Sequence, residues 1–164
     1  MRILVIKSIV FTLLVPGTVA VMVPWSIIQE AEVGDLYSIL SGLFLMAIGI
    51  AIYSWCVWDF VTFGKGTPAP IDAPKNLVVR GLYHYSRNPM YVGVLFFISG
   101  WALLYTIPLM IIYGICVALC FQLFVVFYEE PMLEKLFGSD YGKYCVSVNR
   151  WMPRLGQLIL KSHI

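Results

Sequence analysis

The sequence predicts an all-α integral membrane protein: one membrane domain over residues 1–164, with four transmembrane helices, a hairpin between helices 3 and 4, and a cytoplasmic amphipathic C-terminal segment. The first reason is composition, because 60% of the residues are hydrophobic and only 12% are charged. A soluble domain carries about 25% charge, so this chain needs lipid as its solvent. The second reason is a set of long uncharged stretches, and the third is the side on which lysine and arginine gather.

Three uncharged stretches set the predicted spans. A helix crosses the hydrocarbon core with about 20 residues, so the first two stretches make one span each and the third is long enough for two. Pro108 lies near the middle of the third stretch, and proline disfavours helix just before itself. The predicted spans are about 8–29, 36–58, 89–105 and 108–128.

The basic residues give the orientation. The first predicted loop carries Glu30, Glu32 and Asp35 but no lysine or arginine, whereas the N-terminus, the second loop and the tail are all basic. Four spans place those three segments on the same side of the membrane. Basic loops mark the cytoplasmic side, so both termini are expected in the cytoplasm.

The polar side chains gather in two segments on that side, residues 59–87 and residues 129–154. A hairpin brings its own two ends together, so residues 81–91 and 128–131 should be near neighbours. Two polar segments that are far apart in the sequence therefore meet at the membrane surface.

Several features of these segments admit two interpretations. The Gly- and Pro-rich stretch 64–74 is either a flexible linker or a loop that folds over a ligand. Tyr83, Tyr85 and Tyr91 form either an interfacial aromatic belt or a stacking wall for an adenine ring or a sulfonium. Asn88 and Pro89 are typical of a helix start, and such a start suits an anionic group.

Glu129 and Glu130 close the fourth predicted helix in an unfavourable position. They repel each other, and they lie at a helix C-terminus, where the dipole disfavours negative charge. Membrane-flanking acids can be solvated, or a nearby cation can compensate them. Arg80, Arg87, Arg150 and a cationic ligand are the candidates.

The tail that follows, residues 132–148, has apolar residues at helical spacing and is expected to lie on the membrane or to cover the loop.

Five motifs occur in order on either side of the predicted hairpin. They are Gly81-Leu-Tyr83, Arg87-Asn-Pro-Met-Tyr91-x-Gly93, Glu129-Glu130-x-x-Leu133, Phe137-Gly138-x-x-Tyr141-x-x-Tyr144 and Arg150-x-x-Pro153-Arg154. Together they resemble the isoprenylcysteine carboxyl methyltransferase and phospholipid methyltransferase superfamily, in the form of its prokaryotic members. The resemblance covers about residues 64–154.

The resemblance implies S-adenosylmethionine as cofactor and S-adenosylhomocysteine as product, with the cofactor held by cytoplasmic elements 64–91 and 129–154. In the eukaryotic carboxyl methyltransferases an arginine lies one turn before the motif glutamate and a histidine precedes the proline. Here these positions are Val125 and Asn88, which puts a prenylcysteine acceptor in doubt. By motif position, the cofactor contacts fall on Lys75, Asn76, Leu77, Val78, Tyr83, Asn88, Pro89, Met90, Tyr91 and Glu129.

The reaction that the resemblance implies needs chiefly positioning, which can contribute about 7–11 kcal/mol in good geometries. A carboxylate or thiolate acceptor needs no base, and Arg150 could orient it. An amine acceptor must lose a proton, and Glu130 or a tyrosine could take it. Arg150 and Glu130 are therefore the candidate catalytic residues, and the sequence does not choose between these acceptors.

The expected activity is methyl transfer to a lipophilic or lipidated acceptor, as in isoprenylcysteine carboxyl O-methylation. The alternatives are phospholipid N-methylation, an NADPH-dependent reductase of the sterol reductase type, and a non-catalytic membrane protein. The Glu129-Glu130 pair with Phe137-Gly138 favours a methyltransferase. The expected partner is the lipid bilayer of a prokaryotic inner or plasma membrane, with no metal and no nucleic acid. The oligomeric state is left open.

Overall fold

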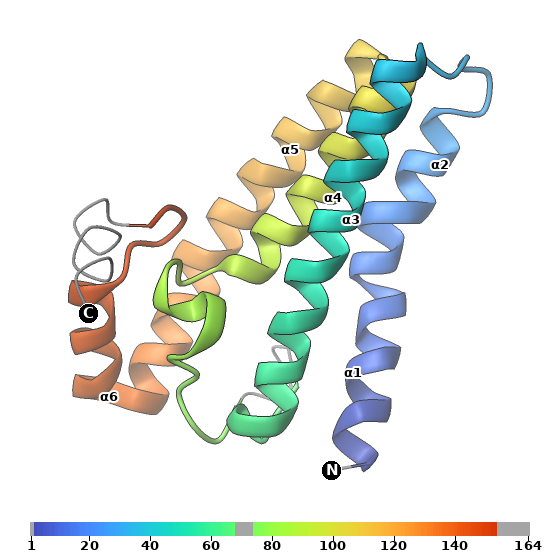
Figure 1. Cartoon of the computed structure of the whole chain (residues 1–164). Coiled ribbons are helices and arrows are strands. Elements are labelled where there is room, and N and C mark those ends of the chain that lie inside the picture. The colour runs from blue at the N-terminus through green and yellow to red at the C-terminus, as the bar shows by residue number, and fades with distance from the viewer. Residues whose placement is uncertain (1, 68–73, 154–164) are drawn as a thin grey trace, which may run out of the picture.

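The computed structural model describes residues 2–67 and 74–153, and all regular structure in these ranges is helical (Figure 1). Parts of the two predicted polar elements, residues 68–73 and Arg154, lie outside the described residues. Three described helical segments are long and apolar enough to cross a membrane, namely Ile3–Ile27, Leu36–Gly64 and Pro108–Ser147, and Pro89–Tyr105 is apolar but shorter. The chain is therefore a multi-pass membrane protein, and the count of four spans stays a prediction.

The first membrane segment is not one regular helix. Helix α1 (Arg2–Leu14) ends just before Pro16, a π-helical turn follows at Thr18–Met22, and α2 (Val23–Ile27) completes the segment. Pro24 has no backbone N–H to donate to the carbonyls four and five residues before it, and neighbouring helices satisfy carbonyls that are freed in this way. Trp101 Nε1 donates to the Ala20 carbonyl at 2.9 Å, and the Tyr113 hydroxyl donates to the Val19 carbonyl at 2.6 Å. The helix begins at Arg2, before the predicted boundary at about residue 8, because arginine and lysine are good helix formers and do not end a helix.

Helix α3 (Leu36–Asp59) begins at an N-cap, where Asp35 Oδ1 accepts from the backbone amide of Ser38 at 2.9 Å. It continues through a π-helical turn at Phe60–Gly64 and ends where Lys65 adopts a left-handed conformation with a φ of 51°. This segment carries the second predicted span and extends it by about one and a half turns.

Helices α4 (Pro89–Tyr105) and α5 (Pro108–Phe124) form the predicted hairpin. Thr106 closes α4 in the left-handed region with a φ of 51°, and Pro108 starts α5. A π-helical turn at Val125–Glu129 then extends α5. Helix α4 has the bounds predicted for the third helix, 89–105. The turn lies just before Pro108, where the proline predicted it.

Helices α3 and α4 pack closely because glycines face glycines across the interface. A Cβ atom on Gly49 would lie 2.5 Å from the Gly93 carbonyl oxygen, and one on Gly42 would lie 2.7 Å from the Gly100 carbonyl oxygen. Small residues allow such backbone approach between membrane helices. This contact fixes the start of α4 against α3, and so helps position the ends of the hairpin.

Helix α6 (Glu130–Ser147) turns away from the end of α5 (Figure 1). Gly138 has a φ of 50° and a ψ of −123°, so it divides α6 into two helical pieces. The second piece of α6 packs on the loop between α3 and α4. Its buried residues Tyr141 and Tyr144, with Val148, form a cluster with Leu77 and Val79 of that loop. The tail thus covers the loop, which is one of the two predicted placements, although Leu136 of the apolar pattern is 53% exposed.

Candidate functional site

The two polar segments meet at the ends of α4 and α5, as the topology predicts. The Tyr91 hydroxyl lies 2.8 Å from Glu129 Oε2, and Arg87 Nη1 lies 2.9 Å from Glu130 Oε1. The chain after α6 also joins this place, because the Arg87 amide donates to the Asn149 carbonyl at 2.9 Å. Residues from the loop, both hairpin helices and the tail therefore share one site.

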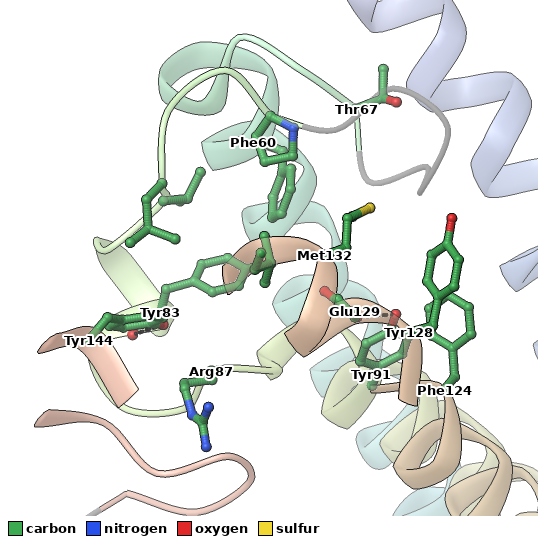
Figure 2. A pocket seen from close by; sticks show the side chains of 14 residues that line it. Phe60, Thr67, Tyr83, Arg87, Tyr91, Phe124, Tyr128, Glu129, Met132 and Tyr144 are labelled. Atoms are coloured by element: carbon green, nitrogen blue, oxygen red, sulfur yellow. Dashed lines mark hydrogen bonds between the residues drawn. The ribbon is translucent and has the colours of Figure 1, made fainter. Parts of the chain in front are cut away.

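A pocket opens at this junction, and we call it the helix-end pocket (Figure 2). Its volume is about 60 Å³, which is room for about two water molecules. Glu129, Arg87, Thr67 and four tyrosines are its polar lining residues. The lining residues are Phe60, Thr67, Pro74, Leu77, Val78, Tyr83, Arg87, Tyr91, Phe124, Tyr128, Glu129, Met132, Leu133 and Tyr144.

Half of the residues expected to bind the cofactor line this pocket, and half do not. Those that line it are Leu77, Val78, Tyr83, Tyr91 and Glu129. Lys75 and Asn76 are exposed, and the Asn76 side chain donates to the Phe63 carbonyl at 3.1 Å. Asn88 is buried and donates from its side chain to the Arg150 carbonyl at 3.1 Å. Pro89 is buried in the first turn of α4, and Met90 faces a different cavity.

Tyr83 forms a buried wall of the pocket. Its ring packs edge-on against Phe60, with ring centroids 5.6 Å apart, and its carbonyl accepts from the Tyr144 hydroxyl at 2.7 Å. Burial raises the pKa of the Tyr83 phenol well above its ordinary value. The phenol therefore stays neutral at physiological pH, and Tyr83 offers an aromatic surface.

Glu129 faces the pocket without a basic partner. Within residues 2–67 and 74–153, its carboxylate pairs with the Tyr91 hydroxyl at 2.8 Å and with no lysine or arginine. A carboxylate in a partly enclosed site is costly unless it is paired with a cation. The geometry therefore leaves a place for a positively charged group beside Glu129.

Glu130 lies in the opposite situation, between two arginines. Arg150 holds it in a bidentate pair, with Nε at 2.8 Å from Oε1 and Nη2 at 2.9 Å from Oε2, and Arg87 adds a contact of 2.9 Å. The hydrogen bond to Glu130 raises the pKa of the Arg150 guanidinium. The two candidate catalytic residues thus hold each other, and either would have to leave this pair to reach a substrate.

Several residues of the site were not singled out from the sequence. Met132 lies three residues after Glu129, a spacing that places the two on the same helix face, so helical periodicity could have identified it beside the motif residue Leu133. Asp59 is 1% exposed and pairs with Arg80 at 3.2 Å, which ties the loop to the end of α3. The signal for Asp59 was a lone carboxylate at the end of an apolar helix.

A second, apolar cavity of about 530 Å³ lies beside the helix-end pocket, and we call it the apolar chamber. Tyr91 and Phe124 line both cavities, so these two side chains form their common wall. The chamber is lined by Phe11, Val15, Pro16, Val19, Tyr53, Met90, Tyr91, Val94, Cys120, Phe121 and Phe124. The site therefore joins a compartment with charged side chains to one suited to a lipid chain.

Comparison with known families adds the deciding observation: the model of the phospholipid methyltransferase family matches residues 37–140. The chain belongs to this family. Members of the phospholipid methyltransferase family generally use S-adenosylmethionine, and the chain is accordingly a membrane methyltransferase. The match includes α4, α5 and the Glu129-Glu130 pair but ends before Arg150. No curated protein and no solved structure matches the chain.

Proposed function

We propose that this protein is an S-adenosylmethionine-dependent methyltransferase that acts on a lipophilic acceptor at the cytoplasmic face of the membrane. The observation that carries the proposal is the position of Glu129. Its carboxylate, which lacks a basic partner among the described residues, lies in a pocket that shares a wall with an apolar chamber. A cationic cofactor on one side and a lipid on the other fit this arrangement.

The residues of the helix-end pocket fit the cofactor chemically. S-adenosylmethionine, when bound, supplies a methyl group on a positively charged sulfur, and a nucleophile takes this group while the carbon–sulfur bonding pair returns to sulfur. Glu129 would hold a positive charge, Tyr83 and Phe60 offer aromatic faces, and Arg87 offers a donor for a carboxylate. Arg87 Nε is buried without a hydrogen-bond partner among the described residues.

The fit requires the pocket to widen. A volume of about 60 Å³ is smaller than a nucleoside, so side chains at the pocket must move when the cofactor binds. Met132 and the half-exposed Tyr128 are placed to do this. Glu130 and Arg150 would remain in their ion pair, where they hold the tail against the pocket.

A phospholipid amine is the first acceptor to test, because the matched family is described by phospholipid methylation. A prenylcysteine carboxylate is the second, since the motifs also resemble the carboxyl methyltransferases. An amine must release a proton on methylation, and Glu130 is held by Arg150 and Arg87, so it would have to leave both contacts to reach an acceptor. A carboxylate needs no base at this step.

The test is transfer of a labelled methyl group by the purified protein in lipid nanodiscs. Phosphatidylethanolamine and N-acetyl-S-farnesylcysteine serve as lipophilic acceptors, and ethanolamine and N-acetylcysteine as their water-soluble counterparts. We expect label in one lipophilic acceptor, and its loss in Glu129→Gln. Equal rates with a water-soluble counterpart would contradict the lipophilic acceptor, and label in none of the acceptors would contradict both candidate substrates.

A further inference from the structure

The apolar chamber contains a polar contact that none of the family motifs includes. Tyr53 of α3 lines the chamber, and it also lines two smaller hollows of about 340 and 300 Å³ beside α1. Its hydroxyl lies 2.8 Å from Thr12 Oγ1 of α1. Tyr53 therefore lies where the chamber continues along the first helix.

The direction of this hydrogen bond follows from the hydrogens available. Thr12 has one hydroxyl hydrogen, and it donates this hydrogen to the Ser8 carbonyl at 2.7 Å. In the contact with Thr12, the Tyr53 hydroxyl must then be the donor. Its oxygen keeps lone-pair capacity to accept a hydrogen bond. The chamber wall thus presents an acceptor atom among mostly apolar side chains.

Two observations argue against a purely structural role for this hydroxyl. Thr12 is already satisfied by the Ser8 carbonyl, a bond that threonine commonly makes within helices. A hydrogen bond between membrane helices contributes only about 0.6 kcal/mol on average, so the tie adds little to stability. Nearby, Ser8 is 1% exposed and its Oγ has no hydrogen-bond partner among the described residues, so a polar atom close to Tyr53 is unsatisfied.

The place of Tyr53 relative to the helix-end pocket supplies the function. Tyr53 and Tyr91 line the same chamber, and Tyr91 contacts Glu129. We propose that Tyr53 binds the polar head of the methyl acceptor by accepting a hydrogen bond from its N–H or O–H group, while the chamber holds the apolar chain. Tyr53 takes no proton, and it determines which acceptors are bound. The identity of the bound lipid as the methyl acceptor rests on the proposed function.

The test uses pairs of single-chain probes that differ in one hydrogen-bond donor. Dodecylamine is compared with dodecyltrimethylammonium, and dodecanol with 1-methoxydodecane, in nanodiscs of the full chain. Apparent dissociation constants come from the probe-dependent shift in melting temperature. The wild type should bind the donor-bearing member roughly three- to tenfold more tightly in at least one pair, as expected for one hydrogen bond. A preference in the first pair alone identifies an ammonium head, and in the second alone a hydroxyl.

Two substitutions make the test specific. Tyr53→Phe should remove the preference, whereas Tyr113→Phe should keep it, because Tyr113 also ties a helix to the first segment but does not line the chamber. No preference in the wild type, or a preference that survives in Tyr53→Phe, would overturn the proposal. S-adenosylmethionine binding is measured on the same samples. If it is absent while Tyr53→Phe still removes the preference, the lipid site stands and the methyltransferase assignment fails.

Discussion

Glu129 and Glu130 are neighbours in the sequence but belong to two different regions. Glu130 is neutralised by Arg150 of the tail and by Arg87, just before α4, whereas Glu129 faces the helix-end pocket and contacts a tyrosine hydroxyl. One carboxylate is fully compensated within the protein, and the other is not. Strongly uncompensated groups concentrate at functional sites, so the contrast separates an anchoring glutamate from a binding glutamate.

The largest effect expected from this contrast is on cofactor affinity. Glu129→Gln removes the charge that faces the pocket, and a hydrogen bond to a charged group contributes about 1.5–3 kcal/mol. We expect S-adenosylmethionine to bind roughly 10- to 100-fold more weakly to this variant, with an unchanged melting temperature. Calorimetric titration measures the affinity. An equal loss in Glu130→Gln, at unchanged stability, would contradict the separation of roles.

The second prediction concerns the anchoring side. Arg150→Gln removes a bidentate ion pair that holds the tail, so the free energy of unfolding should fall by about 1–3 kcal/mol. Lys143→Gln is the matched control, because Lys143 pairs with Asp140 at 3.4 Å on an exposed surface, and exposed pairs contribute little. Chemical denaturation in detergent compares the two. If both substitutions have the same effect, the Arg150–Glu130 pair is not an anchor.

The third prediction concerns the α3–α4 packing that positions the site. Gly49→Ala places a Cβ atom 2.5 Å from the Gly93 carbonyl oxygen, and such overpacking costs about 1–3 kcal/mol. Gly114→Ala serves as the control in α5, because its Cβ would meet Ile98 Cγ2 at an ordinary 3.5 Å. Thermal unfolding should show a lower melting temperature for Gly49→Ala alone. Helix propensity favours alanine over glycine at both positions, so a similar decrease in both variants would mean that the close α3–α4 packing at Gly49 is not its cause.

The sequence predicted the parts of the fold that depend on solvent and on chain connectivity. Apolar length located the membrane helices, Pro108 located the hairpin turn, and the hairpin required its two ends to meet. The match to the phospholipid methyltransferase family confirmed the superfamily that the motifs indicated. These features follow from local composition and from topology, which a single sequence contains.

The direction in which individual side chains point at the site could not be predicted. A π-helical turn at Val125–Glu129 changes the phase of the helix just before the two glutamates, so α-helical periodicity does not show which of them faces the pocket. Asn88 was expected to contact the cofactor, but its side chain donates to the Arg150 carbonyl, which is 62 residues away in the sequence. Contacts of this kind depend on tertiary packing.

The most direct test of the account is calorimetric binding of S-adenosylmethionine and S-adenosylhomocysteine to the purified protein, with NADPH as the control. The account predicts micromolar binding of both, no binding of NADPH, and loss of binding in Glu129→Lys but not in the exposed Lys143→Gln. Binding that is unchanged in Glu129→Lys, or binding of NADPH in place of both compounds, would contradict the assignment of the helix-end pocket.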